Sequence, residues 1–294
     1  METIEQYYKT IKDQFSALIE REKVADRFGE NTVHAFIEKH PLCLLGTVMN
    51  NKIDGYYLYG DCIFSKISFG TWERRVPDFI IITYNSVEVV FNFIEIEAPN
   101  RKIFNGQSDL TADFNHSFTQ LEDWKRLFPT NSLEMERKMV ASCFSDMGIY
   151  DGARAVKAKY ILVYGSSDEY RKDEIKAQRL LEKFSNAGFH FMSYDRLIRQ
   201  FVLERGIYTV KFNRESGGFK AVGWAPYLNY GINRRRSFGR LENKVMLANE
   251  STVLTDEQKG KLSEQILRLD PTPIDRLNAE YLGLDLMDSF EEFS

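Results

Sequence analysis

Cysteine is scarce in this sequence, and the three that occur have no regular spacing. Cys43, Cys62 and Cys143 are an odd number, and none belongs to a Cys-x-x-Cys pair. Disulfide frameworks use even sets of cysteines, and structural zinc sites use closely spaced ones. The sequence therefore argues against a disulfide-bonded module and against a structural zinc site.

Long apolar runs and a leader-like N-terminus are also missing. No apolar run approaches the roughly 18–20 residues that a helix needs to span a bilayer. The chain starts with Met-Glu-Thr-Ile-Glu-Gln, which lacks the basic and then apolar pattern of a signal peptide. The sequence therefore predicts a cytoplasmic protein with no membrane partner.

Motifs of several common enzyme classes do not occur. Gly-Asp-Cys at 60–62 and Gly-Ser-Ser at 165–167 lack the spacing of a phosphate-binding P-loop. Neither a Gly-x-Ser-x-Gly elbow nor a His-Glu-x-x-His zinc motif is present. These absences argue against P-loop nucleotide hydrolysis, α/β-hydrolase chemistry and zinc proteolysis.

An excess of positive charge is missing as well, since 39 Lys and Arg face 43 Asp and Glu for a net charge of −4. Binding to a polyanion would then depend on local basic patches. Arg74 and Arg75 could contact a phosphate, and Arg234, Arg235 and Arg236, which have aromatic neighbours, could follow a nucleic-acid backbone. The alternative is a solvated or internally paired charge run, which is the commoner use of such residues.

What the chain does have is ample apolar content, 43%, with 22 Phe and 15 Tyr, which is enough for a sizeable core. Three- and four-residue apolar spacing predicts helices at 3–28, 31–39 (with Asn31 as N-cap), 110–128, 131–145, 170–187 and 195–204. Aromatic and β-branched runs predict strands at 56–69, 78–84, 87–97, 160–164 and 189–193. This order predicts an α/β (α+β) fold with a mixed sheet.

The character of the sequence changes after about residue 206, where strand-like segments surround Gly217-Gly218 and an acidic helical tail follows. We therefore expect an N-terminal helix at 1–30, a core at 31–205 and an appended C-terminal extension at 206–294.

Three carboxylates fall near the ends of two neighbouring predicted strands. Glu95 and Glu97 share one face of their strand because side chains alternate along it, and Asp78 opens the preceding strand. A hairpin around Asn85-Ser86 brings the three together if a bulge or a longer turn absorbs a mismatch of two residues.

Clustered carboxylates are costly unless water, a cation or a basic partner compensates their charge. Oxygen-only clusters suit Mg²⁺ or Mn²⁺, and such an ion can activate water and offset charge on a phosphodiester. The sequence thus predicts a metal site at Asp78, Glu95 and Glu97. The alternative is a solvated strand face without a function.

A resemblance to a known family rests on five segments in order. Val-Pro-Asp-Phe-Ile-Ile-Ile, Phe-Ile-Glu-Ile-Glu-Ala-Pro-Asn-Arg-Lys-Ile-Phe and His-Ser-Phe-Thr-Gln-Leu-Glu-Asp-Trp-Lys resemble the C-terminal domain of the Shedu anti-phage defence nucleases, in the PD-(D/E)XK superfamily. Ala-Phe-Ile-Glu-Lys-His-Pro-Leu-Cys-Leu-Leu resembles that domain's lead-in helix. Ile-Leu-Val-Tyr-Gly-Ser and Ser-Tyr-Asp-Arg-Leu fit its last two core strands. The resemblance covers roughly residues 31–200.

The resemblance implies a restriction-endonuclease-like mixed sheet flanked by helices, with Asp78 and Glu95 holding Mg²⁺ or Mn²⁺. Glu97 stands where the superfamily usually has a lysine, and it would act there as a base or as a ligand of a second metal ion. Lys66 and Lys102 are candidates to replace the missing lysine, although spacing does not place either of them.

The resemblance also implies roles for helical residues. Gln120 lies where related nucleases place a glutamine that reaches the metal-bound water or the substrate, and His116 shares its helix face. Glu38 on the lead-in helix would add a fourth carboxylate. The alternatives are surface positions for His116 and Glu38, and we expect Trp124 to pack in the core.

The carboxylate pattern and the resemblance together predict a metal-dependent DNA endonuclease that nicks or cleaves phage or plasmid DNA. The resemblance also implies a homo-oligomer, with tetramers known in the family. The alternative, motivated by Glu97, is a catalytically silent nuclease fold that binds or senses nucleic acid. A third hypothesis is an interaction protein whose C-terminal subdomain recruits a partner.

Overall fold

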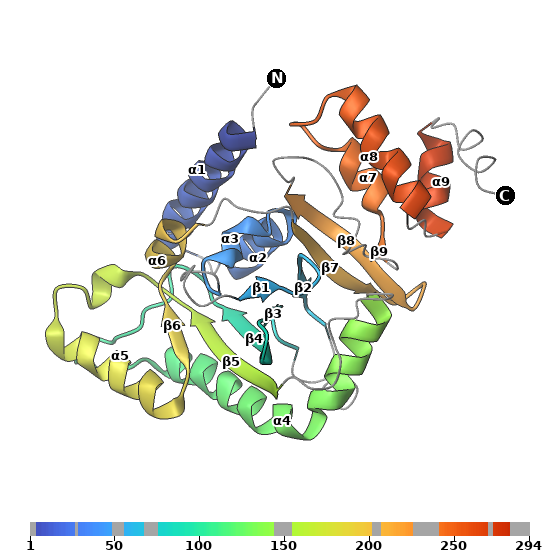
Figure 1. Cartoon of the computed structure of the whole chain (residues 1–294). Helices are drawn as coiled ribbons and strands as arrows, with labels where there is room; N and C mark the ends of the chain where they lie inside the picture. Colours follow the sequence, from blue (N-terminus) through green and yellow to red (C-terminus); the bar gives the residue numbers. More distant parts are fainter. Residues whose placement is uncertain are drawn as a thin grey trace.

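Within the residues that the structure describes, nine strands form one mixed β-sheet with helices on both of its faces (Figure 1). The structure is a computed structural model that describes residues 4–26, 29–48, 56–67, 76–143, 155–201, 207–225, 241–269 and 273–282. The strand order is β6-β5-β4-β3-β2-β7-β8-β9, and β1 also pairs with β3. The predicted mixed α/β fold with flanking helices is therefore confirmed.

The strands are β1 Tyr57–Leu58, β2 Cys62–Ser65, β3 Phe79–Tyr84, β4 Glu88–Ile96, β5 Ala155–Val163, β6 His190–Met192, β7 Ile207–Asn213, β8 Gly218–Ala225 and β9 Leu241–Glu242. The helices are α1 Ile4–Lys23, α2 Glu30–Lys39, α3 Leu42–Leu45, α4 Ala112–Cys143, α5 Glu174–Ala187, α6 Tyr194–Arg199, α7 Lys244–Asn249, α8 Asp256–Leu269 and α9 Pro273–Tyr281, with a 3₁₀ turn at Ser167–Glu169. None of the helices in the described ranges combines the length and the apolarity needed to cross a bilayer.

The β3–β4 hairpin settles the register that the sequence left open. Tyr84 pairs with Val89, so the four residues 85–88 connect the paired positions. The Asn85 side chain accepts hydrogen bonds of 2.9 Å from the backbone N–H groups of Val87 and Glu88 and so closes this turn. A longer turn therefore absorbs the mismatch of two residues between Asp78 and Glu95. It is one of the two expected alternatives, the other being a bulge. One step beyond the Phe79–Ile94 pair, Asp78 lies opposite Glu95.

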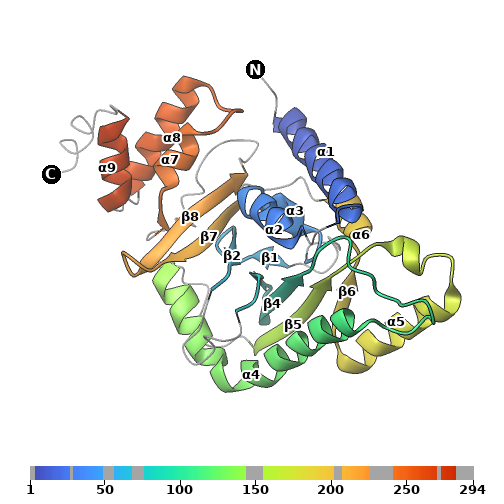
Figure 2. The same ribbon diagram turned by 180° about the vertical axis from the view of Figure 1, so that it is seen from behind.

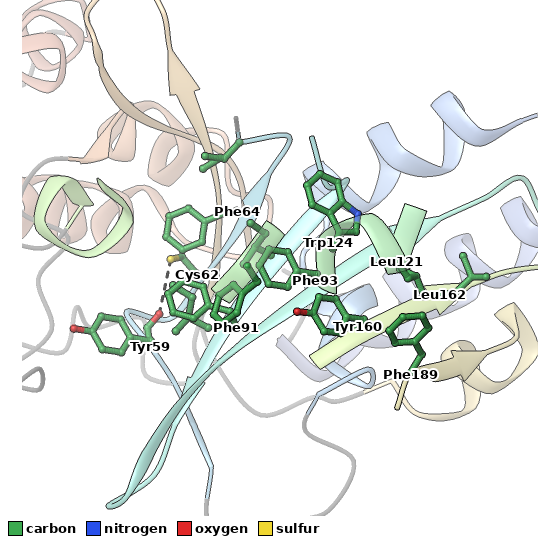
Figure 3. Packing of buried hydrophobic residues seen from close by; sticks show 14 of the residues in the cluster. Tyr59, Cys62, Phe64, Phe91, Phe93, Leu121, Trp124, Tyr160, Leu162 and Phe189 are labelled. Atoms are coloured by element: carbon green, nitrogen blue, oxygen red, sulfur yellow. Dashed lines mark hydrogen bonds between the residues drawn. The ribbon is translucent and has the colours of Figure 1, made fainter. Parts of the chain in front are cut away.

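The two faces of the sheet carry separate cores because strand side chains alternate. On one face, aromatic residues pack against α4 and α5, with Phe93 stacked on both Trp124 and Tyr160 (Figure 3). On the other face, Ile94 and Ile96 pack against residues from α1, α2, α3 and α6. Figure 2 shows the sheet enclosed between these two layers from behind. The strand ends that lie between these two layers therefore have α2 on one side and α4 on the other.

The strands of the predicted C-terminal extension continue this sheet. β7 pairs in parallel with β2, from Cys62 opposite Tyr208 to Phe64 opposite Val210, and β8 and β9 follow. Helices α7, α8 and α9 pack on one another in a small apolar cluster beyond β8 (Figure 1). The division of the chain into three units at 30 and 205 stays a prediction.

Several predicted boundaries were wrong for local reasons. The predicted helices 110–128 and 131–145 are one helix, α4, which continues through Pro129. The predicted strand 56–69 is two strands, since Gly60 and Asp61 adopt left-handed backbone angles, φ 70° and φ 49°, and turn the chain. Gly29, rather than Asn31, is the N-cap of α2.

Candidate functional site

Asp78 and Glu95 face each other at the end of the β3–β4 pair and are joined through backbone groups. The N–H of Ile96 donates a 3.0 Å hydrogen bond to Asp78 Oδ2, and the N–H of Asp78 interacts with the Glu95 carboxylate. Both residues are buried, with 7% and 8% of their surface exposed. The hairpin therefore fixes two carboxylates side by side, as the sequence predicted.

Glu97 lies one residue beyond β4, where its backbone N–H still donates to Val163 of β5 at 3.0 Å. Its carboxylate accepts a 2.5 Å hydrogen bond from Ser117 Oγ of α4, and Arg101 Nε lies 3.0 Å from its Oε2 atom. The Tyr194 hydroxyl donates to the Glu97 carbonyl at 2.5 Å. Glu97 is therefore held from three sides.

Glu30 is a fourth carboxylate in this group, and the sequence patterns did not predict it. It opens α2, and its charge raises the pKa values of Asp78, Glu95 and Glu97, so its side chain lies close to these carboxylates. The available signal was the spacing of four that places Glu30, His34 and Glu38 on one face of α2.

Burial is the main influence on the protonation of these carboxylates. It raises the pKa of Asp78 to about 7, although the bond from Ile96 and the charge of Lys66 act in the opposite direction. Burial, followed by the charges of Asp78 and Glu97, holds the pKa of Glu95 well above its usual value. Burial also raises the pKa of Glu97 against the opposing effects of Ser117 and Arg101. The cluster therefore resists full ionisation unless a cation compensates it.

His34 connects the carboxylate cluster to α2. Its ring stacks on Phe79 with centroids 4.5 Å apart, its Nδ1 lies 3.4 Å from Glu38 Oε1, and its Nε2 lies 3.7 Å from Asp78 Oδ1. Burial, aided by the positive charge of Lys66, lowers the pKa of His34 to about 4. A neutral imidazole with its Nε2 beside Asp78 is chemically suited to join a metal's ligands.

Glu38 takes a different place from the one predicted for it. Its carboxylate accepts a hydrogen bond from Ser65 Oγ and lies 2.6 Å from Lys211 Nζ of β7. Glu38 therefore orients His34 and connects α2 to β7, while Glu30 is the α2 residue that adds a carboxylate to the group.

Lys66 follows β2 directly and lies on the other side of Asp78. Its Nζ is 3.8 Å from Asp78 Oδ1, and its backbone N–H donates to the Asp78 carbonyl at 3.0 Å. Lys102, the other candidate to replace the missing lysine, is exposed, and its carbonyl oxygen accepts hydrogen bonds from the Thr111 and Tyr164 hydroxyl groups.

The site residues that the sequence predicted on α4 do not all lie on the same face of the helix. Ser117 binds Glu97, and the partly buried Gln120 has a buried Oε1 atom without a hydrogen-bond partner. His116 is exposed on the helix surface, the alternative that the sequence allowed for it. Trp124 packs in the core against Phe93. Ser117 thus connects α4 to the carboxylates, and Gln120 lies about one turn further along the same helix.

The donor set fits a hard divalent cation. Glu95 Oε2 is a buried acceptor without a hydrogen-bond partner, and it lies among carboxylates whose charges repel one another. Gln120 Oε1 on α4 is a second buried acceptor without a partner. However, in the described ranges no group of three His, Cys, Asp or Glu side chains is already arranged around a common point as metal ligands. A bound cation would offset the mutual repulsion of these carboxylates and supply the partner that Glu95 Oε2 lacks.

The remaining predicted residues, Arg74, Arg75, Arg234, Arg235 and Arg236, lie outside the described residues.

Comparison with known proteins identifies a family for most of this region. A family model described as Shedu protein SduA, C-terminal, matches residues 29–198, which run from the start of α2 to α6 and include every carboxylate of the site. No curated protein matches the chain.

Proposed function

The chain belongs to the Shedu protein SduA C-terminal family, which indicates a role in anti-phage defence, and from this premise we propose that it nicks or cleaves DNA with a divalent metal ion. The observation that carries this proposal is the buried group of Asp78, Glu95 and Glu97 at one sheet end, with acceptor atoms that have no partner. Buried carboxylates without compensation are costly, and a bound divalent cation would offset that cost.

Mg²⁺ or Mn²⁺, when bound, would supply an activated water and offset charge on the scissile phosphate. Asp78 and Glu95 would hold the ion, because the hairpin fixes them opposite each other. Glu97, with its raised pKa and its contacts to Ser117 and Arg101, is suited to accept a proton from the attacking water. The Gln120 amide would orient that water.

The proposal includes the partners and surroundings expected from the sequence. The substrate is phage or plasmid DNA in the cytoplasm, and the active form is a homo-oligomer of up to four copies. Arg74, Arg75 and the run Arg234–Arg236 are the basic residues that we expect to contact the phosphates.

Plasmid nicking tests the proposal directly. The wild-type protein should convert supercoiled plasmid into open-circular or linear forms with Mg²⁺ or Mn²⁺ and not with a chelator. Glu95→Gln should lose about 10²-fold or more in rate, as expected for loss of a metal ligand. Glu122→Gln, on the exposed face of α4, is the matched control and should cut normally. Intact plasmid with wild-type protein in both metals would contradict the proposal.

A catalytically silent nuclease fold is the second candidate, favoured by Glu97 at the usual lysine position. Isothermal titration calorimetry separates the two functions. A silent fold should show no Mn²⁺ binding that Asp78→Asn or Glu95→Gln removes, yet it should still bind DNA.

A further inference from the structure

We propose that Lys66 is the cation that contacts the scissile phosphate, in place of the lysine that the motif lacks. The inference rests on the proposed nuclease function and adds a residue to it. The ligand class is a phosphodiester oxygen, which an ammonium group can approach and stabilise as negative charge develops.

The register of the sheet places Lys66 beside the carboxylates. In the β2–β3 pair, Ser65 lies opposite Phe79, so the next step puts Lys66 opposite Asp78, and the 3.0 Å bond from Lys66 N–H to the Asp78 carbonyl extends the pairing to that step. In the β3–β4 pair, Asp78 lies opposite Glu95 by the same continuation. Lys66, Asp78 and Glu95 therefore form one row across three adjacent strands.

The backbone of Lys66 adopts a conformation that non-glycine residues rarely use. Its φ is 47°, in the left-handed region, at the point where β2 ends. Such conformations are unfavourable for side chains with a Cβ, and they collect at functional sites. This turn keeps the ammonium group near Asp78 while the chain leaves the sheet.

Among the cations that the described residues bring to this site, Lys66 has room for a ligand. Arg101 lies between Glu97 and Asp113, at 3.0 and 3.5 Å, and the Lys211 ammonium group lies 2.6 Å from Glu38. Lys66 is 3.8 Å from its acidic neighbour, beyond hydrogen-bond distance, and 44% of its side chain is exposed. Its N–H donors can therefore turn to a phosphate from solvent.

Two substitutions test this role without disturbing the turn. Lys66→Asn removes the charge but keeps a residue that tolerates left-handed angles, and Lys66→Arg keeps the charge. Lys172→Ala, an exposed lysine before α5, is the control. Each variant is measured for Mn²⁺ affinity by calorimetry, for melting temperature, and for plasmid nicking at saturating metal.

Lys66→Asn should lower the nicking rate by about 10²-fold, as does loss of one donor to developing charge in other enzymes. Its Mn²⁺ affinity should stay equal or increase, because a positive charge beside the carboxylates has been removed. Lys66→Arg should recover part of the rate. A structural role would instead lower the rate, the metal affinity and the melting temperature together.

Wild-type nicking that Lys66→Asn leaves unchanged would overturn the role of Lys66 and leave the nuclease function standing. Loss of both nicking and Mn²⁺ binding in Lys66→Asn would assign it a structural role and overturn the inference. A wild-type protein that neither binds Mn²⁺ nor nicks DNA would overturn the proposed function, and the role of Lys66 with it.

Discussion

Lys211 of β7 lies 2.6 Å from the carboxylate of Glu38 on α2, the helix that also contributes His34 and Glu30 to the candidate site. Glu38 in turn lies 3.4 Å from His34, which stacks on Phe79. A strand from the C-terminal part of the chain is thus connected through two side chains to the carboxylate cluster.

Lys211→Met should reduce activity more than it reduces stability. A partly exposed ion pair contributes about 0–1 kcal/mol, so the free energy of unfolding should change little. Nicking should fall several-fold, because Glu38 no longer fixes His34. The control is Lys220→Met, at the residue that pairs with Lys211 across β7 and β8, and this variant should cut normally. Equal activity in the two variants would show that the ion pair does not orient α2.

Gly223→Ala should displace α2 or unfold the protein. A Cβ at this position of β8 would lie 1.8 Å from the Glu38 carbonyl oxygen, which is backbone and cannot move without the helix. We expect a loss of at least about 2 kcal/mol in chemical denaturation, in the range of severe overpacking. At Gly260 of α8 a Cβ meets no atom within 4 Å, so Gly260→Ala should stabilise the helix by about 1 kcal/mol. A tolerated Gly223→Ala would contradict this close approach of strand and helix.

The metal-free protein should become less stable as pH rises from about 6.5 to 8.5. Asp78 has a pKa of about 7 in the folded state, against 3.8 for an unperturbed aspartate, so in this range the folded protein binds more protons than the unfolded chain. The stabilisation that Asp78 contributes is complete below the pKa of the unfolded chain. It is lost as the pH rises through about 7, the pKa of Asp78 in the folded state. His34, with a pKa of about 4, acts only at lower pH, where its own contribution to stability falls as the pH decreases from 6.5 through 4 and opposes the gain from Asp78.

The melting temperature as a function of pH measures this effect. Asp78→Asn should melt higher than the wild type at pH 8.5 without metal, and its slope should be smaller. Saturating Mn²⁺ should flatten the wild-type slope, since a bound cation favours the ionised carboxylates. A melting temperature that rises with pH in this range would contradict the assignment.

Ser117→Ala should shift the pH dependence of nicking. Ser117 Oγ donates to Glu97 and so favours its charged form, and removing it should raise the pKa of Glu97 further. If Glu97 is the base, the acidic limb of the rate profile moves to higher pH. Stability should fall by about 1 kcal/mol, the usual value of one buried hydrogen bond. Thr119→Ala, exposed on the same helix, should leave the profile in place.

The hairpin and its carboxylates were predictable because local signals carry them. Alternating side chains put Glu95 and Glu97 on one face, and Asn85 marked the turn, although only the structure shows that four residues connect the paired positions. The pairing register of a hairpin depends on its turn, which is a local feature of the chain. The sequence therefore left two alternatives for this register, a bulge or a longer turn.

The rest of the site depends on contacts between segments far apart in the chain. Which carboxylate of α2 meets the cluster is decided by how α2 packs on β8, where Gly223 meets Glu38, and helical spacing cannot show this. The same holds for Lys66, whose position follows from its pairing with Asp78 at the end of β2. Glu30 and His34 were missed for this reason, and Glu38 was one candidate for the position that Glu30 occupies.

The parallel pairing of β2 with β7 has a practical consequence for fragments of this chain. The family match ends at residue 198, before β7 begins at Ile207, yet β7 covers the outer edge of β2 along Cys62, Ile63 and Phe64. A fragment cut to the limits of the match would expose that edge, with its row of unpaired N–H and C=O groups next to apolar side chains. Such an edge recruits strands from other molecules, so the fragment would aggregate through the very strand that leads to Lys66.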